Sequence, residues 1–268
     1  MRKNRVRGVL FPGAAAVLAA ALHLGATPAA SAAEPYKAPR TADGKADLNG
    51  IWQTLNTANW DLQEHAARTG LVVALGAVGA EPGGLGVVEG GEIPYLPEAA
   101  AKKKANFEKR LTDDPEIKCY LPGVPRATYM PYPFQIVQTP KSILIAYEYA
   151  GAARTIYMDK VPPGPADSWM GHSVGHWEGD TLVVDTVGFD DRSWITAQGH
   201  PHTEKLHVTE RIRRPDLGHL EIEFTIEDPG AYAKPWIIKR VADLDPDDEI
   251  GEYVCTEGER DVVHMVGK

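Results

Sequence analysis

Residues 170–186 read MGHSVGHWEGDTLVVDT, and this stretch indicates how the chain folds. Two strand-like runs flank the dipeptide Gly179-Asp180. A two-residue loop with glycine first suits a type II′ turn, which joins the strands of a β-hairpin. This turn would pair Glu178 with Thr181 and thereby set the register of both strands. The stretch therefore predicts a tight antiparallel hairpin.

Similar short runs, separated by Gly, Pro and Asp residues, continue along most of the chain. The first is NGIWQT (49–54), and from Phe134 onward they are FQIVQT, SILIAYEY, RTIYMD, GHSVGHW, TLVVDTV, KLHVTERIR, HLEIEFTIED, WIIKRVA and EYVC. Many short strands with such turns are typical of a barrel or sandwich, and the lack of a sequence repeat disfavours a propeller. We therefore predict an all-β, lipocalin-like antiparallel barrel of about 8–10 strands with short helical insertions.

The region before Phe134 contains an insertion, at about residues 57–118, into one barrel domain that spans residues 34–268. Helical patterns cover WDLQEHAARTG (60–70) and PEAAAKKKANFEKR (97–110), the second with proline in its first turn. The intervening stretch is rich in Gly, Ala and Val up to Gly91. Two interpretations of it stay open: a flap over a pocket, or a loop packed on the barrel exterior.

Residues 1–33 have the composition of a secretory signal peptide. Four basic residues precede an Ala/Leu/Val-rich run, and the end PAASAAEP offers cleavage after Ala32 or Ala33. A membrane anchor is the alternative, which Pro12, Gly13 and the many alanines disfavour. We therefore predict an exported protein, periplasmic or extracellular, with no membrane span after cleavage.

The net charge disfavours one class of partner. The chain carries a net charge of −9, and removal of residues 1–33, with four basic and no acidic residues, makes it −13. A protein this acidic repels phosphate backbones, so we predict no nucleic-acid partner. The expected partner is a small-molecule ligand or substrate. No cofactor is predicted, and the oligomeric state stays open.

Cys119 and Cys255 are the two cysteines of the chain, and both lie in the part predicted to be exported. An even number of cysteines in an oxidising compartment favours a disulfide between them. It would tie the middle of the chain to the C-terminal tail and stabilise the fold by about 4 to 5 kcal/mol on the chain-entropy model. A metal–thiolate site is the alternative, which the absence of a Cys-x-x-Cys spacing disfavours.

Titratable side chains gather on one face of the predicted hairpin. Residues two and four apart in a strand share a face, so His172 and His176 lie on the same side as Asp185. Asp185 would sit diagonally between the histidines, where a carboxylate can orient an imidazole and stabilise its charged form. A one-residue slip would put the histidines and Asp185 on opposite faces. With the expected register, His172 is a candidate base and Asp185 its orienting partner.

Glu210 interrupts the apolar face of a second predicted hairpin, over residues 206–226. Pairing Ile212 with Leu220 places Glu210 among leucine, valine and isoleucine side chains. A carboxylate in such surroundings is unfavourable unless it is paired, protonated or hydrated, and its pKa should rise. Glu210 is therefore a candidate general acid or base. The alternative is a structural hydrogen bond to a buried Arg or Tyr.

Two other motifs compete with this acid–base interpretation. GHPHTEKLH (199–207) resembles a metal site, but Pro201 favours polyproline geometry, which splays the first two histidines apart. Metal binding is therefore kept as an alternative. GHSVGH (171–176) contains a formal Gly-x-Ser-x-Gly around Ser173. A strand follows where a nucleophile elbow needs a helix, so we attribute this match to chance.

Two resemblances to known proteins agree with a barrel. Gly50-Ile51-Trp52 resembles the Gly-x-Trp of the lipocalins, whose tryptophan closes one end of a ligand-holding barrel. TADGKADLNGIWQ, PYPFQIVQTP, GHWEGDTLVVDTVGF and HVTERIRRPDLGHLEIEFTIEDP are similar to segments of a widespread group of exported β-proteins of environmental bacteria. This second resemblance covers nearly the whole mature chain and assigns no catalytic residue. In that group the position of His176 is often basic without being histidine, which favours His172.

These features are compatible with functions of different classes. The first is an enzyme whose barrel-interior site performs acid–base chemistry, by elimination, isomerisation or hydrolysis, on a small organic molecule. Its catalytic residues would be His172, Asp185 and Glu210. Its pocket would be lined by Tyr129, Tyr132, Tyr147, Trp169 and His176. The others are a carrier of an apolar ligand and a His-coordinated metalloprotein, and the clustering of titratable groups favours the enzyme.

Overall fold

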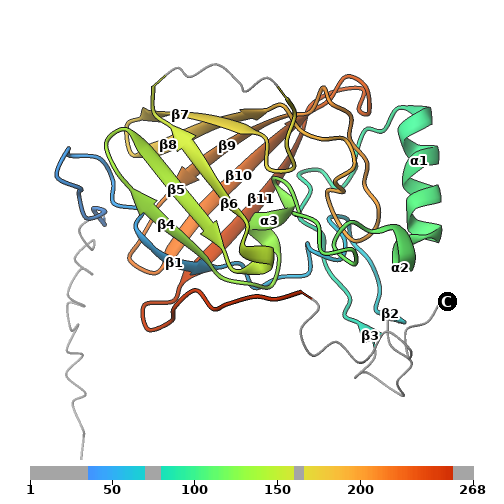
Figure 1. Cartoon of the computed structure of the whole chain (residues 1–268), viewed down its shortest axis with the longest axis horizontal. Coiled ribbons are helices and arrows are strands. Elements are labelled where there is room, and N and C mark those ends of the chain that lie inside the picture. The colour runs from blue at the N-terminus through green and yellow to red at the C-terminus, as the bar shows by residue number, and fades with distance from the viewer. Residues whose placement is uncertain (1–35, 70–79, 160–165, 256–268) are drawn as a thin grey trace, which may run out of the picture. The chain divides into compact units, whose positions relative to one another are not determined.

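The computed structural model describes residues 36–69, 80–159 and 166–255, and the predicted signal peptide lies outside them (Figure 1). Nine strands close into a barrel in the spatial order β1-β11-β10-β9-β8-β7-β6-β5-β4. Their bounds are β1 Gly50–Gln53, β4 Phe134–Gln138, β5 Ser142–Tyr147, β6 Ala153–Tyr157, β7 His172–Glu178, β8 Thr181–Val187, β9 His207–Arg213, β10 His219–Glu227 and β11 Trp236–Leu244. The predicted all-β barrel is therefore confirmed.

Alternation of apolar and polar side chains explains why these segments become barrel strands. In β10, Leu220, Ile222, Phe224 and Ile226 are buried, and the residues between them are polar and at least partly exposed. Successive side chains of a strand point to opposite faces. Alternation of apolar and polar residues therefore places the apolar side chains toward the core and the polar side chains toward water. The interior of the barrel is accordingly filled by the apolar faces of its strands.

Neighbouring barrel strands are antiparallel with one exception, the seam between β6 and β7. Here the strands run parallel and pair only through Ile156 with Ser173 and Tyr157 with Val174. A parallel pair needs a crossover connection in place of a hairpin turn, and residues 158–171 make that connection. The pairing lies at the end of β6 and near the start of β7, so the first residues of β6 are outside it. This seam corrects the expectation of a wholly antiparallel barrel.

Trp52 joins the first strand to the loop that follows β9. Its side chain is fully buried, and its indole N–H donates to the Leu48 carbonyl at 3.1 Å. The guanidinium of Arg214 lies 5.1 Å from the centre of the indole ring. Arg214 also donates to the Asp47 and Leu217 carbonyls at 2.9 and 2.7 Å. The Gly-x-Trp tryptophan therefore packs inside the fold, with a cation over its ring.

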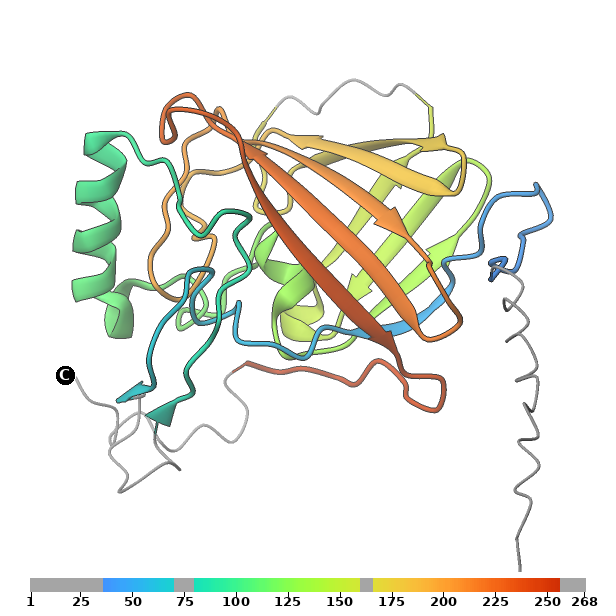
Figure 2. The same ribbon diagram turned by 180° about the vertical axis from the view of Figure 1, so that it is seen from behind.

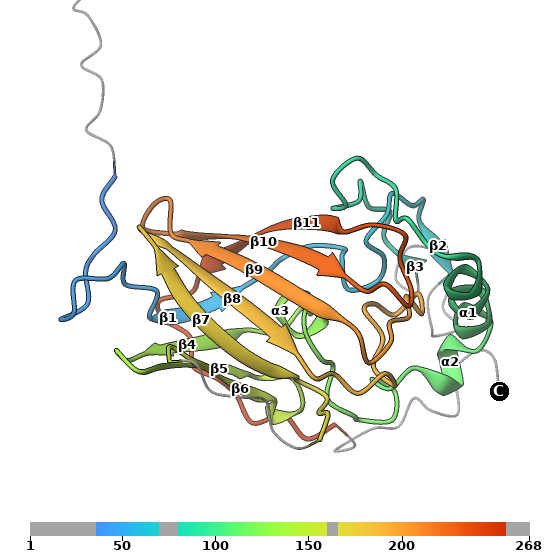
Figure 3. The same cartoon turned by 90° about the horizontal axis from the view of Figure 1, so that it is seen from above.

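The insertion lies to one side of the barrel strands (Figure 2). Its elements are β2 Arg68–Thr69, β3 Ala80–Glu81, α1 Pro97–Glu108 and α2 Arg110–Asp113, and α3 Arg126–Tyr129 follows it in the sequence before β4. α1 begins with Pro97, which suits a first helical turn because that turn leaves its N–H groups unbonded. The helix predicted at 97–110 is confirmed. Viewed from above, α3 lies nearer to the barrel strands than α1 does (Figure 3).

Residues 60–69 form turns and an extended segment, so the helix predicted there is wrong. His65 forms a β-bridge with Gly84, and the Leu62 carbonyl accepts a hydrogen bond from the Val87 N–H at 2.7 Å. Because these backbone groups are bonded to a distant segment, they cannot form the hydrogen bonds of a helix.

The Gly/Ala/Val-rich stretch up to Gly91, interpreted as a flap or an exterior loop, is only partly described, since residues 70–79 lie outside the described part of the chain. Beyond them, Val88 forms a β-bridge with Ile238 of β11, and the Glu89 N–H donates to the Ile237 carbonyl at 2.9 Å. This end of the stretch therefore packs beside a barrel strand.

The C-terminal tail is held by the predicted disulfide. Cys119 and Cys255 are bonded, with Cα atoms 5.8 Å apart. Residues 252–255 belong to no strand, so the strand expected at EYVC is wrong. Among the described residues, no helix combines the length and apolar character needed to cross a membrane.

Candidate active site at the β6–β7 seam

The β7–β8 hairpin has the predicted register but turns its other face to the barrel interior. Glu178 pairs with Thr181, as the two-residue turn requires. Ser173 and Thr186 are buried on the inner face, where their hydroxyl oxygens are 2.9 Å apart. β8 reads TLVVDTV, with leucine or valine on both faces, so alternation does not decide which face is buried.

His172, His176 and Asp185 therefore lie on the outer face, which corrects the predicted arrangement in the barrel lumen. Asp185 Oδ1 accepts a hydrogen bond from the Thr209 hydroxyl at 2.9 Å. His207 Nε2 lies 2.9 Å from the same oxygen. Asp185 thus contacts a histidine, but this histidine comes from β9 and not from β7.

Glu210 lies on the inner face of β9, as predicted, and is fully buried. β9 and β10 pair Ile212 with Ile222 instead of Leu220, and a shift of two residues leaves the faces unchanged. Arg154 Nη1 and Nη2 donate to the two Glu210 carboxylate oxygens at 2.5 and 2.8 Å. Of the two interpretations of Glu210, the structure therefore shows the hydrogen bond to a buried arginine.

Arg154 is a fixed cation inside the barrel. Its Nε donates to the Tyr147 hydroxyl at 3.1 Å, and that oxygen is 3.3 Å from the Thr128 hydroxyl. Burial alone would lower the pKa of Arg154, but Glu210 and Tyr147 together outweigh burial and raise this pKa above its usual value. A guanidinium has five N–H groups, and Glu210 and Tyr147 accept from three of them. Two N–H groups of Arg154 are therefore not bonded to Glu210 or Tyr147.

A cleft of about 370 Å³ opens beside Arg154, along the first residues of β6 and β7, which are not paired with each other. The side chains that matter for its chemistry are Leu121, Arg154, Tyr157, Trp169, Met170 and His172. The His172 ring stacks on the Tyr157 ring, with centroids 5.5 Å apart and planes at 23°. An imidazole, aromatic rings and a buried cation therefore line one cleft.

Trp169 extends the aromatic wall of the cleft toward the surface. Its indole stacks on the ring of Tyr120, with centroids 5.1 Å apart. The guanidinium carbon of Arg192 lies 4.9 Å from the centre of the indole ring, within the range of a cation–π contact. Of the residues predicted for the site, His172 and Trp169 line the cleft, and Tyr147 and Glu210 do not line it but hydrogen-bond Arg154.

Arg154 is the residue that sequence reasoning missed, and a signal for it exists. Arg154 is two residues before Ile156, which is buried, so the two side chains share the inner face of β6. Arg154 therefore lies at an inward-facing position of the strand, and a cation at such a position can supply the partner that a buried Glu210 requires. The cleft itself had no such signal, because it depends on the parallel pairing of β6 with β7.

Tyr129 and Tyr132 were predicted to line the pocket but lie away from the cleft. Tyr129 belongs to α3, and its hydroxyl donates to the Ile195 carbonyl at 2.6 Å. Tyr132 packs against the rings of Tyr149 and Tyr253, with centroids 5.5 and 5.2 Å away. Both contacts hold loops against the barrel, which is a structural role.

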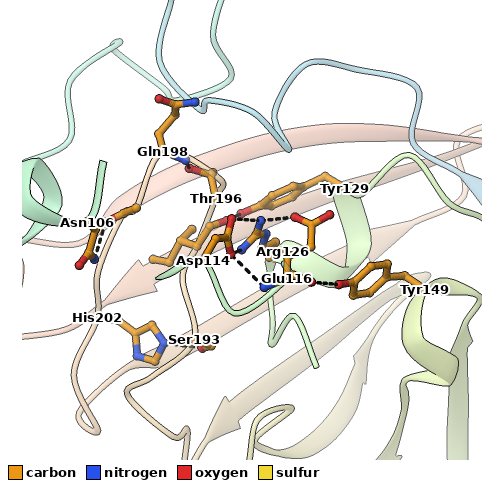
Figure 4. A network of polar contacts seen from close by, with 12 residues as sticks. Asn106, Asp114, Glu116, Arg126, Tyr129, Tyr149, Ser193, Thr196, Gln198 and His202 are labelled. Carbon is orange, nitrogen blue, oxygen red and sulfur yellow. Dashed lines mark hydrogen bonds and ion pairs between the residues drawn. The ribbon is translucent and has the colours of Figure 1, made fainter. Parts of the chain in front are cut away.

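A second polar network fixes α3 (Figure 4). Arg126 donates to both Asp114 carboxylate oxygens at 2.8 and 2.9 Å and also pairs with Glu116. The Tyr149 hydroxyl donates to the Glu116 carbonyl at 3.1 Å. Burial would lower the pKa of Arg126, but Asp114 and Glu116 outweigh burial and raise it. The network therefore keeps a charged arginine that ties α3 to the segment leading to Cys119.

His200, in the candidate metal motif, is fully buried in a different environment. Its Nε2 is 3.4 Å from Asp61 Oδ1, an ion-pair distance without the alignment of a hydrogen bond. Burial lowers the pKa of His200, and Asp61 opposes this only in part. Burial raises the pKa of Asp61, but His200, the Gln63 N–H and Lys103 together outweigh it, so this pKa is lowered. In the described part of the chain, no three His, Cys, Asp or Glu side chains are grouped to hold a metal ion.

Comparison with known proteins adds neither a family nor an activity. No family model matches the chain, and no curated protein matches its sequence. What the protein does is therefore inferred from the chemistry of the cleft at the β6–β7 seam.

Proposed function

We propose that this protein is an enzyme that performs acid–base chemistry on a small organic molecule bound in the β6–β7 cleft. One observation carries the proposal: His172 and the buried Arg154 are both among the residues that line the cleft. An imidazole can accept and return a proton near neutral pH. A guanidinium can bind a carboxylate or the negative charge that develops on an oxygen during reaction.

Each residue of the cleft has a distinct role in this proposal. His172 transfers the proton, and Arg154 binds the anionic part of the substrate. Glu210 and Tyr147 are positioning residues, because they hydrogen-bond Arg154 and are not among the residues that line the cleft. The aromatic wall favours a planar or ring-bearing substrate. An elimination, an isomerisation or a hydrolysis would use these groups in the same way.

The test is a screen of the purified protein against pools of small aromatic acids, esters and glycosides. Mass spectrometry would report both the molecules that stay bound and the molecules that are converted. We expect conversion of at least one molecule that carries a carbonyl or carboxylate group. A molecule that is retained but never converted would identify a carrier.

Variants of two histidines on the same face of β7 sharpen this test. His172→Ala should lower turnover by about 10²- to 10⁴-fold, the usual contribution of a general acid or base. His176→Ala is the matched control, because this side chain is exposed and is not among the residues that line the cleft. Equal turnover by the two variants would contradict the role of His172.

We further propose that the protein is exported. Residues 1–33 support this proposal by their composition, and the Cys119–Cys255 disulfide is typical of an oxidising compartment. N-terminal sequencing of protein from cell fractions should find a chain that begins at Ala33 or Glu34. A mature protein that retains residues 1–33 would contradict cleavage.

A further inference from the structure

Ser193 and His202 form a pair within the loop between β8 and β9 (Figure 4). Ser193 Oγ and His202 Nε2 are 2.6 Å apart, the distance expected between a nucleophile and its general base. Ser193 is 4% exposed and His202 1% exposed, so bulk water competes little for their hydrogen bond. Neither residue takes part in the chemistry proposed for the cleft.

A third group orients the imidazole. His202 Nδ1 is 3.0 Å from the Thr203 carbonyl oxygen, which can only accept a hydrogen bond, so Nδ1 carries the proton. Nε2 then has a free electron pair and accepts the hydrogen bond of the Ser193 hydroxyl. Burial lowers the pKa of His202, which favours this neutral form. The imidazole therefore has the tautomer that a general base requires.

Asp228 holds the residue that orients His202. Its carboxylate accepts from the Thr203 N–H at 2.6 Å and from the Thr203 hydroxyl at 2.7 Å. It also accepts from the Gly230 N–H at 2.8 Å. Asp228 thus fixes Thr203 through its N–H and hydroxyl, and the Thr203 carbonyl in turn orients His202 toward Ser193, so Asp228 is a positioning residue.

The space beside the serine hydroxyl depends on Gly123. A Cβ atom at this position would lie 3.0 Å from Ser193 Oγ and 3.0 Å from the Trp169 carbonyl oxygen. A side chain at this position would therefore crowd the Ser193 hydroxyl, and glycine avoids that contact. The same glycine borders Trp169, whose ring lines the β6–β7 cleft.

Ser173 provides an internal contrast. It is also buried and lies in the Gly-x-Ser-x-Gly pattern, but its hydroxyl is bonded to the Thr186 hydroxyl at 2.9 Å. A hydroxyl neighbour cannot act as a base at neutral pH, whereas an imidazole can. Of the two serines, Ser193 is the one with an activating partner.

We propose that Ser193 is a nucleophile activated by His202 and that it accepts acyl groups from esters. Ser193 Oγ attacks the ester carbonyl, its proton moves to His202 Nε2, and a bond forms between Oγ and the carbonyl carbon. The bond from this carbon to the alcohol oxygen breaks, and the alcohol leaves with the proton from His202. Water then attacks the acyl-serine with His202 as base, which releases the acid and restores the hydroxyl.

The test is labelling of the full-length protein with a fluorophosphonate probe, which bonds to activated serines with loss of fluoride. Peptide mapping of the wild-type protein should place the label on Ser193. Protein unfolded in urea should not be labelled, because the serine is activated only in the fold. A wild-type protein with no label on Ser193, or with its label on Ser173, would overturn the proposal.

Three variants identify the base and provide the control. Ser193→Ala should abolish labelling, and His202→Gln should slow it by about 10²- to 10⁴-fold, the usual contribution of a general base. Ser173→Ala should be labelled at the wild-type rate. Circular dichroism would check that each variant is folded. A folded His202→Gln protein that is labelled at the wild-type rate would show that the hydrogen bond to Ser193 is only structural.

His172→Ala should retain labelling, which separates this site from the proposed chemistry of the cleft.

Discussion

β8 and β9 carry two carboxylates at adjacent positions of the ladder but on opposite faces of the sheet. Asp185 pairs with Thr209 and faces outward, whereas Glu210 pairs with Val184 and faces inward. The Asp185 side chain is 45% exposed, and the Glu210 side chain is fully buried. Water solvates the outer carboxylate, so it needs no cation. The inner carboxylate is out of reach of water, and its charge is compensated by the hydrogen bonds from Arg154. A carboxylate on the inner face therefore depends on a buried cation.

The largest effect is expected when the inner pair is broken. Glu210→Gln would leave the Arg154 guanidinium buried without a counter-charge and should destabilise the protein by about 3 to 5 kcal/mol. Urea unfolding followed by circular dichroism would measure the loss. The double variant Arg154→Met/Glu210→Leu should recover most of it, because no buried charge remains. A double variant as unstable as the single one would show that packing, and not charge, causes the loss.

The second-largest effect is expected from acid, which should destabilise the folded protein through its buried histidines. Burial lowers the pKa values of His200 and His202 below their usual value of about 6.5. The folded state therefore binds fewer protons than the unfolded state below this pH. The stabilisation is complete above about pH 6.5 and is lost as the pH falls toward the folded-state pKa values, by about 1.4 kcal/mol per pH unit for each histidine.

Urea unfolding between pH 7 and pH 5 would measure this slope. His200→Gln should flatten it, because one of the two buried imidazoles is removed. The exposed His176 is the control on the outer face, and His176→Gln should leave the slope unchanged. A slope that is insensitive to His200→Gln would assign the acid sensitivity to other groups.

A smaller effect is expected from a neutral pair on the inner face. Thr186→Val would remove the hydroxyl that is 2.9 Å from Ser173 Oγ and leave that oxygen buried without this partner. We expect a loss of about 1 to 2 kcal/mol in the free energy of unfolding. The double variant Ser173→Ala/Thr186→Val should be close to the wild type, since both polar groups are then absent. Additive losses in the double variant would contradict a shared hydrogen bond.

The smallest effect is expected on the outer face. Asp185→Asn would weaken the contact with His207 and retain an oxygen that can accept from Thr209. Because the side chain is partly exposed, the loss should be less than about 1 kcal/mol. Thermal unfolding of this variant beside Glu210→Gln would test the comparison directly. Equal destabilisation by the two substitutions would contradict the difference between the faces.

The local pattern predicted much of the fold and part of the candidate site. The Gly179-Asp180 turn fixed the β7–β8 register, and strand alternation placed Glu210 inside. The pattern leaves two interpretations of Glu210 open, a general acid or base and a structural hydrogen bond to a buried Arg or Tyr. His172 and Trp169 were singled out and do line the cleft. Asp185 was placed on the wrong side, because β8 is apolar on both faces and only the completed barrel distinguishes them.

The sequence by itself determined the strands, their turns and which side chains share a face, because these depend on bond geometry within a few residues. The tertiary structure alone decided which face of β7–β8 is inside, where the parallel seam opens, and how Arg154 meets Glu210 across 56 residues of chain. The same holds for His200, whose burial depends on the distant Asp61 segment. The free energy of a buried charge or imidazole is set by its neighbours in space, and those neighbours exist only after the barrel has closed.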